Sequence, residues 1–141
     1  MTKLFPLSIK LFISLMLCVA GLAYVTLIAS IWSDTGLSIS VIAEAYGSME
    51  PIEFIQHSFR YMFWFTGIFV MTAVPFFLTA YPEKLKRAVA VVIPLLIVSD
   101  IGSAWLIRYH AFFAWQLSVT GALLAACFLL MFSLIQYDLW S

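Results

Sequence analysis

The chain has 141 residues, of which 65% are hydrophobic and only 10% are charged, and its formal net charge is zero. A soluble domain carries about 25% charged residues, so a chain this short cannot bury so much apolar surface in a core of its own. The composition excludes an ordinary water-soluble domain and predicts a membrane protein, and the zero net charge gives no electrostatic basis for binding nucleic acid.

The first apolar run covers residues 11–32 and is long enough to cross a hydrocarbon core, which takes about 20 residues. It follows Lys3 and Lys10, as the apolar region of a signal peptide follows basic residues. Signal-peptide apolar regions run only about 7–15 residues, however. We therefore predict an uncleaved membrane-spanning helix.

The segment 33–58 is the only sizeable stretch outside the predicted spans. Within it, Ile39, Ile42, Ala43 and Tyr46 recur at helical spacing between two groups of turn-forming residues. This pattern predicts a short amphipathic helix that lies on the membrane surface or caps the bundle.

The second apolar run covers residues 59–81 and contains Pro75. Membrane helices tolerate an internal proline when neighbouring groups satisfy the freed carbonyl, so we expect a kink there. Pro51 suits the first position of a helix. The sequence therefore favours a helix that begins near Pro51 and projects beyond the bilayer.

The third and fourth runs, residues 88–109 and 112–137, are separated by a very short connection. That spacing predicts a tight antiparallel hairpin. The four spans together predict an all-α polytopic membrane protein with four transmembrane helices in an antiparallel bundle. We interpret residues 1–141 as a single domain.

Basic residues predict the orientation of the bundle, because positive charge favours the cytoplasmic side. Arg60 and Arg108 fall on one side of the predicted spans. A larger group falls on the other side: Lys3, Lys10, Lys84, Lys86 and Arg87. Both termini are therefore predicted to be cytoplasmic, and segment 33–58 and the 109–112 turn to lie outside.

Asp100 interrupts the third apolar run near its middle. A carboxylate at that depth costs about 2.5–3.5 kcal/mol on insertion scales, so it is expected to face the bundle interior and to have a partner. The sequence offers two readings: a structural acid paired across helices with arginine, tyrosine or serine, or an acid that carries protons or binds a ligand. Arg108 and Arg60 are the candidate basic partners. With a structural acid, leucine at position 100 should destabilise the protein more than asparagine does.

His57 and His110 are the only histidines, and both fall near the outer ends of predicted membrane helices. A four-helix bundle can hold haem b between two histidines on different helices. The alternative is that each histidine makes ordinary hydrogen bonds at the membrane interface.

Catalytic and metal-binding motifs are missing from the sequence. It contains no nucleophile elbow, no H-E-x-x-H, no phosphate-binding loop and no dinucleotide glycine motif. Cys18 and Cys127 both lie in apolar runs without C-x-x-C spacing, so no metal site is predicted. The sequence favours a protein that is not an enzyme.

Three stretches carry a resemblance to a group of small uncharacterised four-helix membrane proteins of Gram-negative bacteria: "TGLSISVIAEAYGS", "HSFRYMFWFTGIF" and "DIGSAWLIRYHAFFAW" with the terminal "YDLW". The resemblance implies a location in the bacterial inner membrane. In that group a histidine pair, H-x-H, opens the second helix. Here His57 matches the first position and Phe59 stands at the second, a departure that weakens a haem or metal interpretation.

Three functional hypotheses follow from these observations. The first is an accessory or structural subunit of a larger membrane complex, in contact with lipid and with a membrane protein partner or other copies of itself. The second is a redox subunit that holds haem b between His57 and His110. The third is an oligomeric small transporter or channel with Asp100 in its path.

Overall fold

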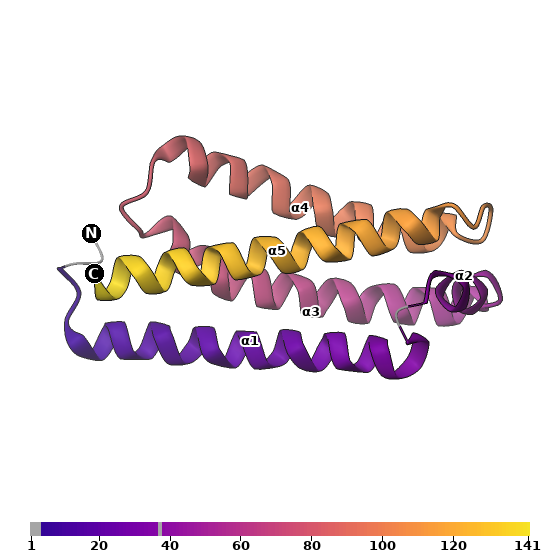
Figure 1. The fold of residues 1–141 in the computed structure, drawn as a ribbon, viewed down its shortest axis with the longest axis horizontal. Helices are drawn as coiled ribbons and strands as arrows, with labels where there is room; N and C mark the ends of the chain where they lie inside the picture. Colours follow the sequence, from indigo (N-terminus) through magenta and orange to yellow (C-terminus); the bar gives the residue numbers. More distant parts are fainter. Residues whose placement is uncertain (1–3, 37) are drawn as a thin grey trace.

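The computed structural model describes residues 4–36 and 38–141. It is all-helical, and the described residues contain no strand. Four long helices and one short helix follow in chain order (Figure 1): α1 (Leu7–Thr35), α2 (Ile39–Gly47), α3 (Pro51–Phe77), α4 (Glu83–Leu106) and α5 (Phe113–Trp140). The predicted all-α class, with four long helices and a short helix in the first outer segment, is confirmed.

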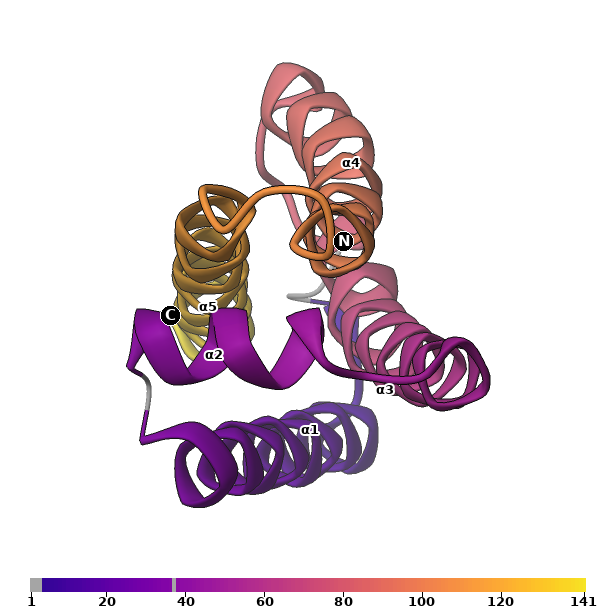
Figure 2. The same ribbon diagram turned by 90° about the vertical axis from the view of Figure 1, so that its right-hand side faces the viewer.

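The four long helices run alternately up and down (Figure 1). The beginning of α1, the α3–α4 connection and the end of α5 lie at one end of the bundle, and the α4–α5 turn lies at the other. Helix α2 lies across that second end, roughly perpendicular to the long helices (Figure 2). The short helix therefore caps the bundle, one of the two placements that the sequence predicted.

The helices extend beyond the apolar runs at most of their ends. Helix α1 continues past residue 32 and ends where Gly36 takes a left-handed conformation, φ 61°, and donates its N–H to the Trp32 carbonyl. Helix α3 begins at Pro51, as the proline predicted, several residues before the apolar run at 59–81. Helical hydrogen bonding therefore continues past these ends of the apolar runs, whereas α3 and α4 end at Phe77 and Leu106, a few residues before the runs at 59–81 and 88–109 do.

Helix α4 contains a second internal proline, Pro94, in addition to Pro75 of α3. The N-terminal part of α4 diverges from α5, and its C-terminal part lies beside α5 (Figures 1 and 2). An apolar groove of about 370 Å³ lies between α3 and the divergent part of α4, with Phe69, Val70 and Ile93 among its lining residues.

The bundle has two clusters of buried apolar side chains. The larger cluster runs along its length and centres on residues such as Leu124 and Phe128 of α5. The smaller one joins α2 to the hairpin of α4 and α5 through Ile42, Ile107 and Ala114. These contacts hold α2 in place over the end of the bundle.

Large apolar side chains also cover the outside of all four long helices, among them Leu15, Val70, Val98 and Leu129. Each long helix is long and apolar enough to cross a membrane. Exposing so large an apolar surface to water is energetically unfavourable, whereas lipid solvates it. The chain is a small multi-pass membrane protein whose helices contact the lipid bilayer.

Candidate functional site

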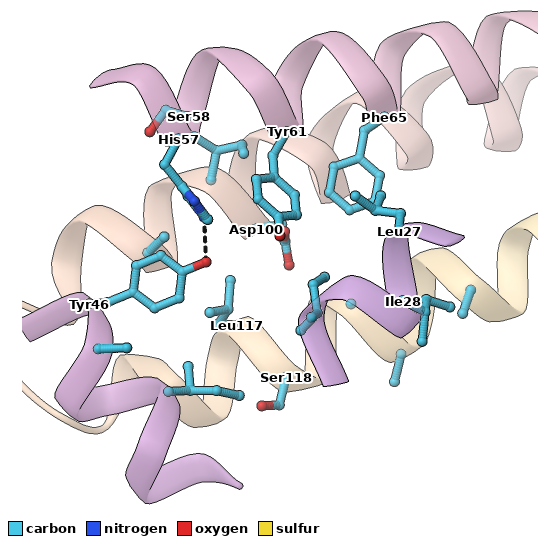
Figure 3. A pocket seen from close by; sticks show the side chains of 18 of the residues that line it. Leu27, Ile28, Tyr46, His57, Ser58, Tyr61, Phe65, Asp100, Leu117 and Ser118 are labelled. Carbon is cyan, nitrogen blue, oxygen red and sulfur yellow. Dashed lines mark hydrogen bonds between the residues drawn. The ribbon is translucent and has the colours of Figure 1, made fainter. Parts of the chain in front are cut away.

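A cavity of about 540 Å³ lies beneath α2, in the half of the bundle that α2 caps (Figure 3). All five helices contribute to its wall, which is mainly apolar. Its polar and aromatic lining residues face one another across the cavity: Tyr24, Tyr46, His57, Ser58, Tyr61, Asp100 and Ser118. Ligand sites in proteins are typically concave, mostly apolar and provided with a few convergent polar groups, with volumes of about 300–1,000 Å³.

Asp100 projects from α4 into the middle of this cavity and is 7% exposed (Figure 3). Its Oδ1 accepts a hydrogen bond of 2.7 Å from the Thr120 hydroxyl of α5. The same hydroxyl also lies within hydrogen-bonding distance of the backbone carbonyls of Gln116, at 3.0 Å, and Leu117, at 2.9 Å. Thr120 therefore retains acceptors of its own when Asp100 is replaced.

Neither Arg60 nor Arg108, the two arginines expected as partners, pairs with Asp100 in the structure. Arg108 donates instead to the Met49 carbonyl at 2.9 Å, and its guanidinium lies 5.7 Å from the centre of the Phe54 ring. Arg60 is exposed on α3. Arg108 lies about two helical turns beyond Asp100, so its side chain reaches the polar end of the bundle more easily than the buried carboxylate.

Thr120 is the partner that sequence reasoning missed, although a signal for it was present. Asp100 and Thr120 are equally far along the chain from His110, in the turn of the α4–α5 hairpin. Residues equally far from such a turn lie at the same level of two antiparallel helices. The predicted hairpin therefore pointed to residue 120.

His57 and Tyr46 form the second polar element of the site. The Tyr46 hydroxyl and His57 Nε2 are 2.5 Å apart, which joins α2 to α3 directly above the cavity (Figure 3). Burial raises the pKa of the Tyr46 phenol above its usual value, and the charges of Tyr61 and Asp100 add to the rise. Tyr46 therefore keeps its proton and can donate a hydrogen bond to Nε2, an arrangement in which the imidazole is neutral.

The two histidines are not brought together in a common site. His57 lines the cavity, and its ring also lies 4.3 Å from the Tyr61 ring, centre to centre. His110 lies in the α4–α5 turn, is exposed, and accepts the Phe112 N–H on Nδ1 at 3.0 Å. Among the described residues, no group of three or more histidines, cysteines or acids is placed to hold a metal ion.

Phe54 connects the α2 cap to the bundle. Its side chain is 1% exposed, and its ring lies 5.9 Å from that of Tyr46 and 5.1 Å from that of Trp105, centre to centre. The Trp105 indole donates to the Ser58 hydroxyl at 2.7 Å. Helix α2 forms the roof of the cavity. This roof is therefore held by packing and hydrogen bonds that involve α2, α3 and α4 together.

We expect Asp100→Leu to lower the free energy of unfolding more than Asp100→Asn, by about 1 kcal/mol, the net value of one hydrogen bond. Asparagine keeps an oxygen that accepts from Thr120, whereas leucine does not. The difference stays small because the Thr120 hydroxyl can turn to the Gln116 or Leu117 carbonyl. Thermal unfolding of the two variants in the same detergent measures it, and equal stabilities would contradict the structural role of the Asp100–Thr120 bond.

The fold and its lipid-facing surface define the class: an integral membrane protein with four membrane-spanning helices. A family model described as a transmembrane helical domain, Aq_1264_TM, matches residues 56–141. The chain belongs to this family. Comparisons with curated proteins and with solved structures found no match.

The matched region divides the candidate site. It contains His57, Asp100 and Thr120, together with α4, α5 and most of α3. Helix α1 and the cap α2, with Tyr46, lie before it. The carboxylate and its threonine partner therefore belong to the family domain, and part of the cavity wall and its roof come from outside the match.

Proposed function

We propose that the protein binds a small lipophilic molecule in the cavity beneath α2. The observation that carries this proposal is the cavity itself, which has apolar walls and sets Asp100, Tyr46, His57 and Tyr61 around one space. A buried carboxylate in a membrane helix is costly. Helix packing alone does not account for a carboxylate at position 100, because the Thr120 hydroxyl has backbone carbonyls to donate to when the carboxylate is absent.

Lining residues of both α1 and α5 are exposed, so part of the cavity wall reaches the lipid-facing surface at these helices. Ile28 of α1 is 38% exposed and Ala122 of α5 is exposed, whereas Ile101 and Ala104 on the α4 side are buried. The α5 wall carries small residues, including Gly121 and Ala125. A ligand that enters here comes from the bilayer, and this favours a molecule that dissolves in lipid.

Gly121→Leu is expected to reduce ligand occupancy by about tenfold or more, a difference of about 1.4 kcal/mol in binding. Gly121 lines the cavity, and among the described atoms only Asp100 Oδ1, at 3.9 Å, lies within 4 Å of an added Cβ, so the backbone leaves room for a side chain that begins at the cavity wall. Leucine is also the better helix former by about 0.8–1.0 kcal/mol, so the variant should fold. Mass spectrometry of small molecules extracted from the purified protein measures the occupancy.

Gly67→Leu is the matched control for this experiment. Gly67 is exposed on α3, outside the cavity, and an added Cβ meets no atom within 4 Å. The control should retain the same molecule as the wild-type protein. Equal retention by the Gly121→Leu variant, or no molecule enriched in any of the three proteins over empty detergent micelles, would count against a ligand in this cavity.

The wider role that we propose is that of an accessory subunit of a larger membrane complex, with the chain as one domain. Support comes from the small part of the chain outside the long helices and from the apolar groove between α3 and α4, which offers a surface for another membrane helix. Purification from native membranes in a mild detergent tests this role. The expected result is a stoichiometric companion, either another protein or further copies of this chain. A chain that purifies alone as a monomer would contradict it.

The other two hypotheses differ in their structural support. No structural observation supports haem ligation by His57 and His110, because each of the two rings forms a hydrogen bond with a different neighbour. A haem-replete preparation without a Soret band would eliminate it. One observation supports the transport hypothesis, namely that Asp100 lines the cavity. A transporter that uses this acid should lose transport in the Asp100→Asn variant while remaining folded.

We further propose a location in the bacterial inner membrane with both termini cytoplasmic. Lys10, Lys84, Lys86 and Arg87 lie near the end of the bundle that holds the α3–α4 connection, and Arg108 lies near the opposite end (Figure 1). Lys3 lies outside the described residues. Alkaline phosphatase, which is active only outside the cytoplasm, should be inactive when fused after Ser141 and active when inserted at the 109–112 turn.

A further inference from the structure

Neither lysine nor arginine lies beside the carboxylate among the described residues of the cavity wall. Asp100 is the only acidic residue among the described residues that line the cavity, and none of them is a lysine or an arginine. Its described hydrogen bond comes from the neutral Thr120 hydroxyl. A carboxylate surrounded by apolar walls gains most from a partner of opposite charge.

His57 does not supply that charge in the arrangement that the structure shows. Its Nε2 faces the Tyr46 hydroxyl, and when the phenol donates, the imidazole is neutral. Arg108 is occupied at the polar end of the bundle by the Met49 carbonyl and the Phe54 ring. When Asp100 is ionised, a positive partner for it therefore has to come from outside the cavity wall.

Several aromatic side chains line the same cavity as the carboxylate. Tyr46, Tyr61 and Phe65 all face the cavity around Asp100 (Figure 3), and Tyr24 lines it from α1. The negative faces of aromatic rings attract organic cations, most strongly where the cation is removed from water. An acid combined with several aromatic rings in an apolar cavity selects a positively charged, weakly hydrated group.

We propose that the ligand is a lipophilic organic cation, an amine or quaternary ammonium compound, whose charged nitrogen lies against Asp100. Its apolar part would extend along Leu27, Ile28 and Leu117 toward the exposed part of the wall at α1 and α5. The same carboxylate disfavours anionic molecules of similar size. This inference rests on the proposed function of the cavity and adds the chemical class of the ligand.

Benzyltrimethylammonium and its uncharged isostere neopentylbenzene test the inference, because they share one shape and differ only in charge. Binding of each is measured by equilibrium dialysis against the full-length protein in nanodiscs of zwitterionic lipid, and empty nanodiscs correct for partition into lipid. Wild-type protein should prefer the cation. Asp100→Asn should weaken cation binding by about tenfold or more and leave the isostere unchanged. Asp100→Glu, which keeps the charge, should retain the preference.

The remaining outcomes distinguish failure of the cation inference from failure of the ligand cavity itself. If the isostere binds wild-type protein as tightly as the cation, or if Asp100→Asn binds the cation normally, the ligand is not selected by charge and the inference is wrong. In both cases saturable binding that Gly121→Leu abolishes still supports a ligand cavity. If neither probe binds saturably, the cation class is rejected, and the extraction comparison with Gly121→Leu and Gly67→Leu decides whether the cavity holds any other molecule.

Discussion

Replacing Phe54 with alanine is expected to lower the free energy of unfolding by about 3 kcal/mol or more, at the large end for a single substitution. The ring is 1% exposed and packs against Tyr46 and Trp105, with the Arg108 guanidinium over its face. Its removal leaves a space beside Tyr46 and Trp105 that the surrounding side chains are expected to fill only in part. Unfolding in detergent, followed by circular dichroism, measures the loss.

The same substitution should also loosen the roof of the cavity. Tyr46 loses the neighbour that supports its ring, so protease cleavage between α1 and α3 should become faster than in the wild-type protein. Phe59→Ala is the matched control, since Phe59 is 74% exposed on the same helix. It should change the stability by less than about 0.5 kcal/mol. Equal losses for the two variants would mean that Phe54 does not hold the cap.

Leu124→Ala is the second substitution with a large expected effect, about 2–5 kcal/mol. Leu124 is 0% exposed and lies in the cluster that runs along the bundle. Its neighbour Leu123 is 48% exposed and faces outward, so Leu123→Ala removes the same atoms from contact with lipid. Lipid refills that space, whereas the protein interior does not. Denaturant titration in mixed micelles should therefore separate the two variants clearly, and similar losses would contradict the assignment of the α5 faces.

Much of the fold was predictable because lipid imposes a simple requirement. A span needs a certain length of apolar sequence, so the four long helices followed from composition and run length. The position of Pro51 predicted where α3 begins, and the spacing of Ile39, Ile42 and Tyr46 predicted the short helix. These features depend on local sequence.

The candidate site was harder to predict because it depends on how the helices pack. The contact between Tyr46 and His57 exists because α2 crosses the end of the bundle after Gly36, and no local pattern specifies that direction. The divergence of the N-terminal part of α4 likewise depends on packing against α3 and α5. The buried position of Asp100 inside the bundle was expected from the sequence, but its threonine partner was not.

The arginines expected to pair with Asp100 show why contacts between helices are harder to predict than features set by local sequence. Charge pairing suggested Arg60 or Arg108 for Asp100, but an arginine near a helix end can reach the polar interface at less cost than the apolar interior. Arg108 bonds a carbonyl at that end instead. A threonine at the same level of the neighbouring helix satisfies one oxygen of the carboxylate and brings no charge into the core.

Lipid should surround the exposed apolar faces of the four long helices, and a spin label on Cys18 tests this most directly. Cys18 is exposed on α1, and a Cys127→Ala substitution leaves it as the only cysteine. In reconstituted vesicles the label should collide often with oxygen, which concentrates in lipid, and rarely with a water-soluble nickel chelate. Frequent collision with the nickel chelate would show water at this surface and would contradict a membrane-spanning α1.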